Sequence, residues 1–483
     1  MKHVADGGPR SVEFITRNLS ELDRTRRLDA EFFRREALEV EAQLKSICTE
    51  PLTQVADISD GNHFSISESF VDDGGLPYYR GQDVVGHFFI EQASPQLITR
   101  EAYDHAYMRR SHLQQGDVLL SIVGTVGETS LVKTSIEATC SCKLAILLPT
   151  NVDPAYLAAY LSSQHGRTLV RRWKRGAVQT GLLLEDMDQL PVPRFTKTFE
   201  SLVSAAVGLA YHALEESSRL FKGADATFAR NVGLASWAPP AASVYIARSS
   251  SVISAGRLDA EHFQHKFFAA KQAILKAGAI EFVPINALIN VLTNGHTPLR
   301  HDLKEGDVPF LCAEHVDDFN VNYASKKRIL SMQHGGELAR TAVKDGDLLL
   351  TIKGRVGNAA IATTVPGPIN INQDVALMRL NDELPTWYVA SYLNSVFGKL
   401  QTEQFATGGI NPFLGLSNIR QFTIPRFPRL QIDAIAYETM SNVAVARESR
   451  ERAERLLSAA KEAIDISIAQ TEAAGMDFLQ ARL

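Results

Sequence analysis

Residues 116–127 read GDVLLSIVGTVG, and residues 346–357 read GDLLLTIKGRVG. The two stretches agree at eight of their twelve positions. A second pair is separated by the same length of sequence, because residues 27–33 read RLDAEFF and residues 257–263 read RLDAEHF. Two matching pairs at one separation indicate an internal duplication, and this period is too long for a solenoid repeat. The sequence therefore predicts one domain that occurs twice.

Two further pairs follow in the same order within each copy. Tyr160 and Leu161 correspond to Tyr392 and Leu393, and the PRF stretch at 193–195 recurs at 425–427. These pairs lie slightly further apart than the first two, which indicates small insertions in the second copy. Each copy, together with the segment that follows it, thus extends over nearly half of the chain.

Short strands and helices are mixed within each copy. The Gly-Asp stretch predicts a buried strand that ends in a Gly-x-x-Gly turn, and a second apolar strand is predicted at 142–149. A charged helix is predicted at the start of each copy, over 28–47 and 258–277. Another helix is predicted to begin at Pro154, with Asp153 as its N-cap. This mixture favours an α+β fold over a regular alternation of parallel strands and helices.

A long amphipathic segment follows each copy. Apolar residues recur at spacings of four and three from Phe199 to Phe228, and again from Ile435 to Ile464, without a proline. A helix with one narrow apolar seam needs a partner, and we expect the two helices to pair with each other. The predicted fold is α+β, with two tandem mixed α/β domains separated by two long helices that form an antiparallel coiled coil. The predicted domains are a first recognition domain (1–196), a central spacer helix (197–236), a second recognition domain (237–429) and a C-terminal spacer helix (430–483).

Composition excludes several classes of protein. The chain has 483 residues, of which 45% are hydrophobic and 22% charged, as in an ordinary folded protein. The formal net charge is −5, so the overall charge gives no support for a nucleic-acid partner. Four cysteines are too few for a disulfide scaffold and favour a reducing compartment. Because no apolar stretch has the length of a signal core or a membrane span, a cytoplasmic location without membrane contact is expected.

In sequence, the chain resembles the specificity (S) subunit of type I restriction–modification enzymes. The resemblance covers essentially the whole chain and depends on the two tandem copies, their RLDAE starts, Gly-Asp strands and PRF ends, and the helix after each copy. In that family each copy is a target recognition domain that reads one half of a split DNA sequence, and the helices hold the domains apart and dock methyltransferase subunits. The resemblance implies a subunit that recognises a bipartite duplex target and directs adenine methyltransferases to it.

The resemblance also places catalysis in partner proteins, so this chain is expected to be no enzyme. The expected partners are double-stranded DNA, two DNA adenine methyltransferase (modification) subunits and a restriction/translocase subunit. This chain is expected to bind no cofactor, whereas S-adenosylmethionine is expected in the partner methyltransferase. The sequence contains neither a phosphate-binding loop nor a glycine-rich dinucleotide fingerprint, which agrees with a non-catalytic role.

Other functions stay open at this point. The same chain would serve a methylation-based defence system without a standard type I motor, and only neighbouring genes would distinguish the two. A two-headed adaptor that binds protein is a different class, supported by the net charge of −5. A self-contained methyltransferase is disfavoured, because the cofactor motif is missing.

Polar and basic loop residues are the candidates for DNA contact. Arginine and lysine neutralise phosphates, glycine turns let backbone N–H groups approach them, and Arg, Gln and Asn read base edges. In the comparison of the copies, Asn62 and His63 pair with Gly295 and His296. The candidates of the first copy are Asn62, His63, Arg80, Gln82, Thr125, Arg171, Arg172, Lys174, Arg175 and Gln179. Those of the second copy are His296, Glu314, His315, Lys353, Arg355 and Asn411.

Each candidate has a plainer interpretation as an ordinary solvated loop or helix residue. Cys140 and Cys142 form a Cys-x-Cys pair, but no second pair lies at the spacing of a zinc site. No metal site and no catalytic residue are therefore predicted.

Overall fold

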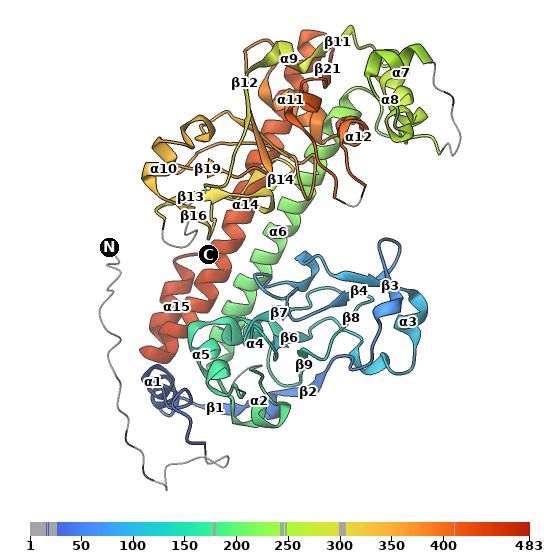
Figure 1. Ribbon diagram of the computed structural model, residues 1–483. Coiled ribbons are helices and arrows are strands. Elements are labelled where there is room, and N and C mark those ends of the chain that lie inside the picture. Colours follow the sequence, from blue (N-terminus) through green and yellow to red (C-terminus); the bar gives the residue numbers. More distant parts are fainter. Residues whose placement is uncertain are drawn as a thin grey trace. The chain divides into compact units, whose positions relative to one another are not determined.

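The computed structural model describes residues 16, 18, 27–176, 180–241, 246, 249–298, 306–409 and 411–483 (Figure 1). The chain divides into two compact units. Unit 1 comprises residues 1–214 and 451–483, and unit 2 comprises residues 215–450. Each unit contains one copy of the duplicated sequence and part of each long helix.

Two small sheets form the centre of unit 1. The first is antiparallel throughout, with the order β2 (Ala56–Asp60), β9 (Leu144–Pro149), β6 (Val118–Ser121), β7 (Thr129–Leu131). The second has the order β3 (Phe70–Val71), β5 (Gln96–Ile98), β4 (Leu76–Tyr79), β8 (Thr139–Cys140), and its β4–β8 pair is parallel. The strands predicted from the Gly-Asp stretch and from 142–149 are confirmed as β6 and β9. A separate antiparallel pair joins β1 (Thr49–Pro51) to β10 (Pro191–Pro193).

Unit 2 repeats this arrangement. Its antiparallel sheet has the order β12 (Ile289–Asn294), β20 (Val375–Leu380), β17 (Leu348–Thr351), β18 (Ala359–Ile361). Its second sheet has the order β16 (Arg328–Ile329), β13 (Val308–Leu311), β19 (Asn370–Ile371), again with one parallel pair, β13–β19. Two short pairs join β11 (Glu281–Pro284) to β21 (Thr423–Arg426) and β14 (Val316–Asp317) to β15 (Asn320–Val321). The matching orders confirm the duplication predicted from the sequence.

Apart from the first helix of each copy and the two long helices, which are described below, the α-helices are short. In unit 1 they are α2 (Leu52–Val55), α3 (Arg100–Asp104), α4 (Pro154–Ser162), α5 (Gln164–Arg172) and α15 (Glu472–Gln480). In unit 2 they are α7 (Ser249–Ala255), α9 (Ile285–Leu288), α10 (Ser331–Gly335), α11 (Thr386–Asn394), α12 (Val396–Phe405) and α13 (Leu416–Ile419).

The repeated Gly-Asp dipeptide has a structural explanation. Gly116 has a φ of 95°, which is readily adopted only by glycine, and the Asp117 carboxylate accepts a hydrogen bond from the Gln114 N–H at 2.7 Å. Burial raises the pKa of the Asp117 carboxyl to about 6. In unit 2, Asp347 accepts from the Lys344 N–H at 2.8 Å in the same way. The dipeptide therefore closes the turn that starts β6 and β17.

The helix after the main sheet begins as predicted. The Asp153 carboxylate accepts hydrogen bonds from the N–H groups of Ala155 at 2.9 Å and Tyr156 at 3.3 Å, so Asp153 is the N-cap of α4. The Tyr156 hydroxyl donates to the Pro193 carbonyl at 2.8 Å and ties the helix to β10. In unit 2, Tyr388 on α11 donates to the Pro425 carbonyl at 2.6 Å. The PRF stretch of each copy thus packs against the first helical turn that follows the sheet.

The charged helix at the start of each copy is shorter than predicted. It comprises Arg35–Leu44 (α1) in unit 1 and His265–Lys276 (α8) in unit 2. Before α1, Arg27 binds Asp29 through two hydrogen bonds of 2.8 and 2.6 Å, and the Phe32 N–H donates to the Asp29 carbonyl at 3.1 Å. These contacts hold the RLDAEFF stretch in a turn that buries Phe32, so the helix begins later than its charge pattern indicated.

The two long helices are α6 (Lys197–Asn231) and α14 (Arg429–Ala469). In unit 2, Glu216 accepts from the Ser449 hydroxyl at 3.4 Å, whereas Asn231 lies beside the start of α14 and accepts from Gln431 at 2.9 Å. Residues further along α6 therefore meet residues earlier on α14, which confirms the predicted antiparallel pairing. Among the described helices, none combines the length and apolar character that crossing a membrane requires.

The long helices also complete the cores of the units. In unit 1, Phe199 and Val203 of α6 share one buried cluster with Leu457 and Ile464 of α14. The Asp465 carboxylate of α14 accepts from the N–H groups of Gln164 and His165, both at 3.0 Å, and so caps α5. The segment 451–483 is thus an integral part of unit 1.

Replacement of Phe228 should destabilise unit 2. Its buried ring packs against four aromatic rings, with centroid distances of 5.2 Å to Tyr392 and 6.1 Å to Tyr388, Phe397 and Phe427. Phe228→Ala should therefore lower the free energy of unfolding by about 3–5 kcal/mol, measured by urea denaturation. Phe268→Ala is the matched control, because that side chain is 61% exposed, and it should change the free energy by under about 0.5 kcal/mol. Equal losses for both variants would contradict this packing.

Candidate nucleic-acid interface

The loops that follow the strands of unit 1 meet at one place. The Asn62 N–H donates to the Cys140 carbonyl at 2.8 Å, and the Cys142 N–H donates back to the Asn62 carbonyl at 2.9 Å. The Ile122 N–H donates to the Lys143 carbonyl at 3.0 Å. These backbone bonds bring together the loops after β2, β6 and β8, although these loops lie far apart in the sequence.

Two more segments complete this group. A Cβ atom at Gly81 would lie 3.5 Å from the Lys143 side chain and 3.6 Å from the Val123 carbonyl, so the loop after β4 reaches the same place. The Gly124 N–H donates to the Thr180 carbonyl at 3.4 Å. We call the residues 61–63, 80–83, 122–127, 141–143 and 180–182 the loop cluster of unit 1. It contains five of the predicted DNA-binding residues, namely Asn62, His63, Arg80, Gln82 and Thr125.

Unit 2 has an equivalent loop cluster, formed by residues 295–297, 312–315, 352–357, 372–374 and 411–414. The Asn372 N–H donates to the Leu311 carbonyl at 2.8 Å, the Ile352 N–H to the Asp374 carbonyl at 2.9 Å and the Leu414 N–H to the Ile352 carbonyl at 2.9 Å. These loops surround a cleft of about 390 Å³. The cleft is lined by Cys312, Ala313, Glu314, Lys327, Lys353, Gly354, Asn372, Asp374, Asn411 and Pro412. Three of the predicted residues, Glu314, Lys353 and Asn411, thus share one cleft.

The structure corrects how the first loops of the two copies pair. A Cβ atom at Gly61 would lie 2.3 Å from the Ser141 carbonyl oxygen, and one at Gly295 would lie 1.8 Å from the Ile371 carbonyl oxygen. Only glycine permits such a close approach, so Gly61 and Gly295 are equivalent. Asn62 is therefore the counterpart of His296, one position away from the pairing that the sequence suggested. The sequence comparison missed this shift because the loop differs in length between the copies.

Some predicted residues serve the turns of the cluster. The Arg80 N–H donates to the Asp83 carboxylate at 2.8 Å, and the Cys312 N–H donates to Nδ1 of the buried His315 at 3.1 Å at the equivalent turn. Burial lowers the pKa of His315, so its ring is neutral near pH 7 and carries its proton on Nε2. Asn62, only 3% exposed, bonds both backbone groups of Phe64, at 2.8 and 3.0 Å. The side chains of Asp83, His315 and Asn62 therefore hold the backbone of these loops in place.

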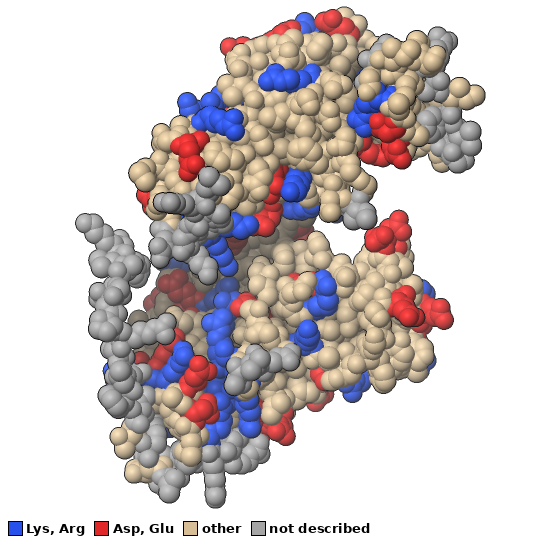
Figure 2. Space-filling model, in the orientation of Figure 1, with Lys and Arg blue, Asp and Glu red and all other residues tan. Residues whose placement is uncertain are grey.

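Some residues of the basic run on and after α5 form ion pairs within the fold, whereas others are exposed to solvent. Arg172 is 8% exposed, donates to the Phe32 carbonyl at 2.9 Å and pairs with Glu41 at 3.0 Å. Arg175 pairs with the buried Asp186 at 2.6 Å. Arg171 is 48% exposed and has only a long contact of 3.5 Å to Glu128. Figure 2 shows basic side chains gathered over α5 on this face of unit 1. Arg171 is therefore better placed than Arg172 to meet a phosphate.

The other candidates lie as follows. Thr125, Gln82, Lys353 and Asn411 are exposed, and Lys174 is half-buried. Arg355 pairs with Asp317 at 2.9 Å, and His296 lies 3.7 Å from Glu337. His63 pairs with Asp60. Gln179 lies outside the described residues. Contact with DNA stays a prediction for every residue of this set.

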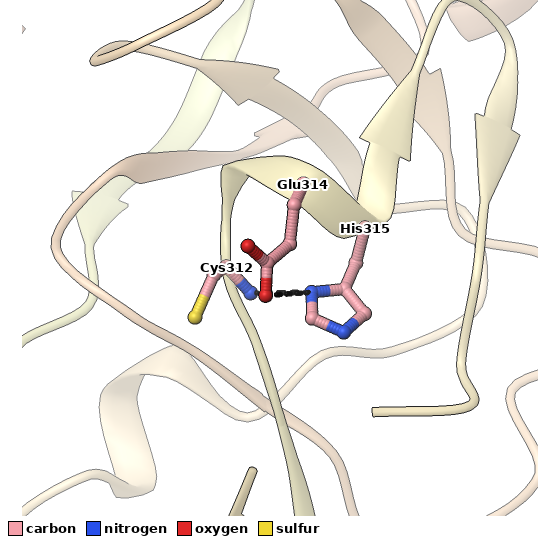
Figure 3. A group of neighbouring side chains, drawn as sticks. All are labelled: Cys312, Glu314 and His315. Atoms are coloured by element: carbon pink, nitrogen blue, oxygen red, sulfur yellow. Dashed lines mark hydrogen bonds and ion pairs between the residues drawn. The ribbon is translucent and has the colours of Figure 1, made fainter. Parts of the chain in front are cut away.

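One group in the described chain has the composition of a metal site (Figure 3). Ligand atoms of Cys312, Glu314 and His315 lie within 4.8 Å of one another. However, Nδ1 of His315 already accepts the Cys312 N–H, and burial raises the pKa of the Cys312 thiol. The Lys327 ammonium lies 3.4 Å from the Cys312 sulfur and 3.2 Å from Glu314. A lysine thus already supplies the positive charge that a cation would bring.

Sequence reasoning missed three residues of this region, namely Lys143 in the loop cluster of unit 1 and Lys327 and Asp374 in the cleft of unit 2. Lys143 and Asp374 directly precede the strands β9 and β20 and occupy equivalent places, because their carbonyl groups accept from Ile122 and Ile352. A column-by-column comparison of the copies after the Cys140 region would have shown this pair. No local signal marks Lys327, which directly precedes the edge strand β16.

The fold defines a class of protein with two copies of one α+β unit, each of which includes part of two long helices. The chain is similar to the type I restriction–modification S subunit from M. genitalium, at 11% identity, over 89% of this chain and 95% of that one, with a TM-score of 0.40. It is also similar to the HsdS subunit from Thermoanaerobacter tengcongensis, at 14% identity over 89% and 96% of the chains, with a TM-score of 0.27. A chain from a structural study of type I R-M complex assembly matches at 14% identity over 86% and 98%, with a TM-score of 0.32. No family model and no curated protein matches the sequence.

Two neighbouring arginines provide a test of the structural role assigned to this region. Arg172→Met should lower the free energy of unfolding by about 2–3 kcal/mol, because it removes a buried ion pair and a charged hydrogen bond to Phe32. Arg171→Met makes the same chemical change at an exposed position and should cost under about 0.5 kcal/mol. Urea denaturation measures both values. A smaller loss for Arg172→Met than for Arg171→Met would contradict the assignment.

Proposed function

We propose that this chain is the DNA-specificity subunit of a type I restriction–modification system, and that it has no active site of its own. The observation that carries the proposal is the presence of two equivalent loop clusters with different side chains on the same backbone frame. A protein that recognises two different half-sites of one polymer needs such a pair. The sequence resemblance to the S-subunit family agrees with it, from the RLDAE starts to the PRF ends.

Each loop cluster reads one half-site in this proposal. The glycine turns at 124–127 and 354–357 let phosphates approach the backbone closely, and exposed basic residues such as Arg171 and Lys353 add charge. Gln82 and Asn411 project from the loops and offer the amide pattern that pairs with adenine in the major groove. Phosphate contacts fix the register, and the loop side chains select the bases.

The two long helices set the separation of the half-sites. Because α6 and α14 each contribute to both units, their length fixes how many unread base pairs separate the two contacts. Adenine methyltransferase subunits, which bring S-adenosylmethionine, supply catalysis, two of them per chain, and a restriction/translocase subunit adds cleavage. The net charge of −5 fits a subunit that shares phosphate neutralisation with these partners. The same charge favours the second candidate, a two-headed adaptor for proteins.

The decisive experiment compares adenine methylation across the genome with and without this gene, in a strain that carries the neighbouring methyltransferase. Long-read sequencing should detect a split motif that disappears on deletion and returns when the gene is restored. The motif would give both half-sites and the gap. An unchanged pattern, in a strain whose methyltransferase is demonstrably active, would reject the proposal in favour of the adaptor.

Lengthening both helices should lengthen the gap. Seven residues inserted after Leu214 in α6 and seven after Arg450 in α14 add two turns at nearly facing positions, since Glu216 contacts Ser449. At 1.5 Å per residue the insertion adds about 10 Å, or about three base pairs, while both half-sites stay the same. The control inserts the same seven residues after Pro239, beyond the end of α6. An altered half-site with an unaltered gap would show that the helices do not set the spacing.

A further inference from the structure

The two loop clusters carry opposite charge at one equivalent position. Lys143 and Asp374 each precede the strand that lies next to β6 or β17, and each accepts the N–H of the matching isoleucine, at 3.0 Å and 2.9 Å. The backbone is therefore the same, and only the side chain differs. A donor-only ammonium in unit 1 corresponds to an acceptor-only carboxylate in unit 2.

A neighbouring position is also more acidic in unit 2 than in unit 1. Tyr79 and Leu311 end the strands β4 and β13 and pair with the equivalent residues Cys140 and Ile371. Counting on from there, Gln82 of unit 1 corresponds to Glu314 of unit 2. The unit 2 cleft therefore has two carboxylates at positions where unit 1 has a lysine and an amide.

The carboxylate of Asp374 is held in place and forms no ion pair with any described residue. One oxygen accepts from the Asn372 side-chain amide at 2.7 Å, and the Asp374 N–H donates to the Asn372 side-chain carbonyl at 3.0 Å. The other oxygen, Oδ1, is shielded from solvent and accepts no hydrogen bond from any described residue. Glu314, in contrast, is paired with Lys327 at 3.2 Å. Asp374 is half-buried and lines the cleft, and no described lysine or arginine pairs with it, so this part of the cleft keeps one uncompensated carboxylate, which favours a ligand that donates.

In DNA, the groups that can donate a hydrogen bond to a carboxylate such as that of Asp374 belong to the bases. Phosphates repel a carboxylate, so Asp374 cannot contribute to backbone contact. In the major groove the donors are the exocyclic amino groups, N4 of cytosine and N6 of adenine. We propose that Asp374 is a specificity-determining residue that accepts a hydrogen bond from a base amino group in the half-site of unit 2. Lys143 favours the acceptor atoms of guanine at the corresponding place in the other half-site. This inference depends on the proposed function.

The test measures methylation of target libraries by the complex of this chain with its methyltransferase. Each library has one base of one half-site randomised. Asp374→Leu removes both acceptor oxygens and should reduce the preference for an amino base at one position of one half-site by about 5- to 100-fold, as expected for losing one base contact, and leave the other half-site unchanged. Asp374→Lys copies the residue of unit 1 and should shift the preference at that position towards guanine. Asp382→Leu makes the same change at an exposed carboxylate after β20 and should alter nothing.

The outcomes separate this inference from the proposed function. If the unsubstituted complex methylates no split motif, the proposed function itself fails. If it does, and both Asp374 variants fold with an unchanged thermal midpoint but keep every base preference, the inference is wrong. A loss of methylation that is equal across all library members would also overturn it, because it would indicate a contact, such as one through a bound cation, that reads no base. If Asp374→Leu does not fold, Asp374→Lys decides the question by the same criteria.

Discussion

The antiparallel pairing of α6 with α14 is the interaction on which both units depend. Each unit buries one part of each helix in its own core, and the core of unit 1 combines two stretches of chain that lie far apart in the sequence. In unit 1 the dependence extends to polar groups, because Asp465 of α14 caps the start of α5 and lies 2.6 Å from the His165 ring. The helix α5 in turn positions the basic residues that were predicted to meet DNA. The apolar seam of the helix pair therefore determines the position of groups that lie far from it in sequence.

In the loop clusters, the residues that fix the backbone are different from the residues that vary between the two copies. Their geometry is fixed by backbone hydrogen bonds and by close contacts at Gly61 and Gly295, which occur in both units whatever the neighbouring side chains are. Because the frame does not depend on the identity of residues such as Lys143 or Asp374, these residues can differ between the copies without a change of fold. A duplicated domain can in this way acquire two different preferences, one in each copy.

The sequence predicted those features that depend on local pattern. The strands of the Gly-Asp stretches, the Asp153 cap and the seam of the long helices follow from neighbouring residues and were confirmed. Features that depend on distant partners were not predictable. The burial of Arg172 requires Phe32 and Glu41, which lie far earlier in the chain, and a basic run gives no sign of such partners. The shift that pairs Asn62 with His296 became visible only through the carbonyl groups that surround Gly61 and Gly295.

The division of unit 1 into residues 1–214 and 451–483 has a consequence for synthesis on the ribosome. Domains usually fold in the order in which they emerge, beginning with the first. Here the second unit has all of its residues once position 450 has emerged, whereas the first still lacks the helix that closes its core. The unit that begins the chain is thus the last to be completed. A polypeptide that ends shortly after residue 450 would retain all of its second unit but leave the apolar cluster of its first unit without Leu457 and Ile464.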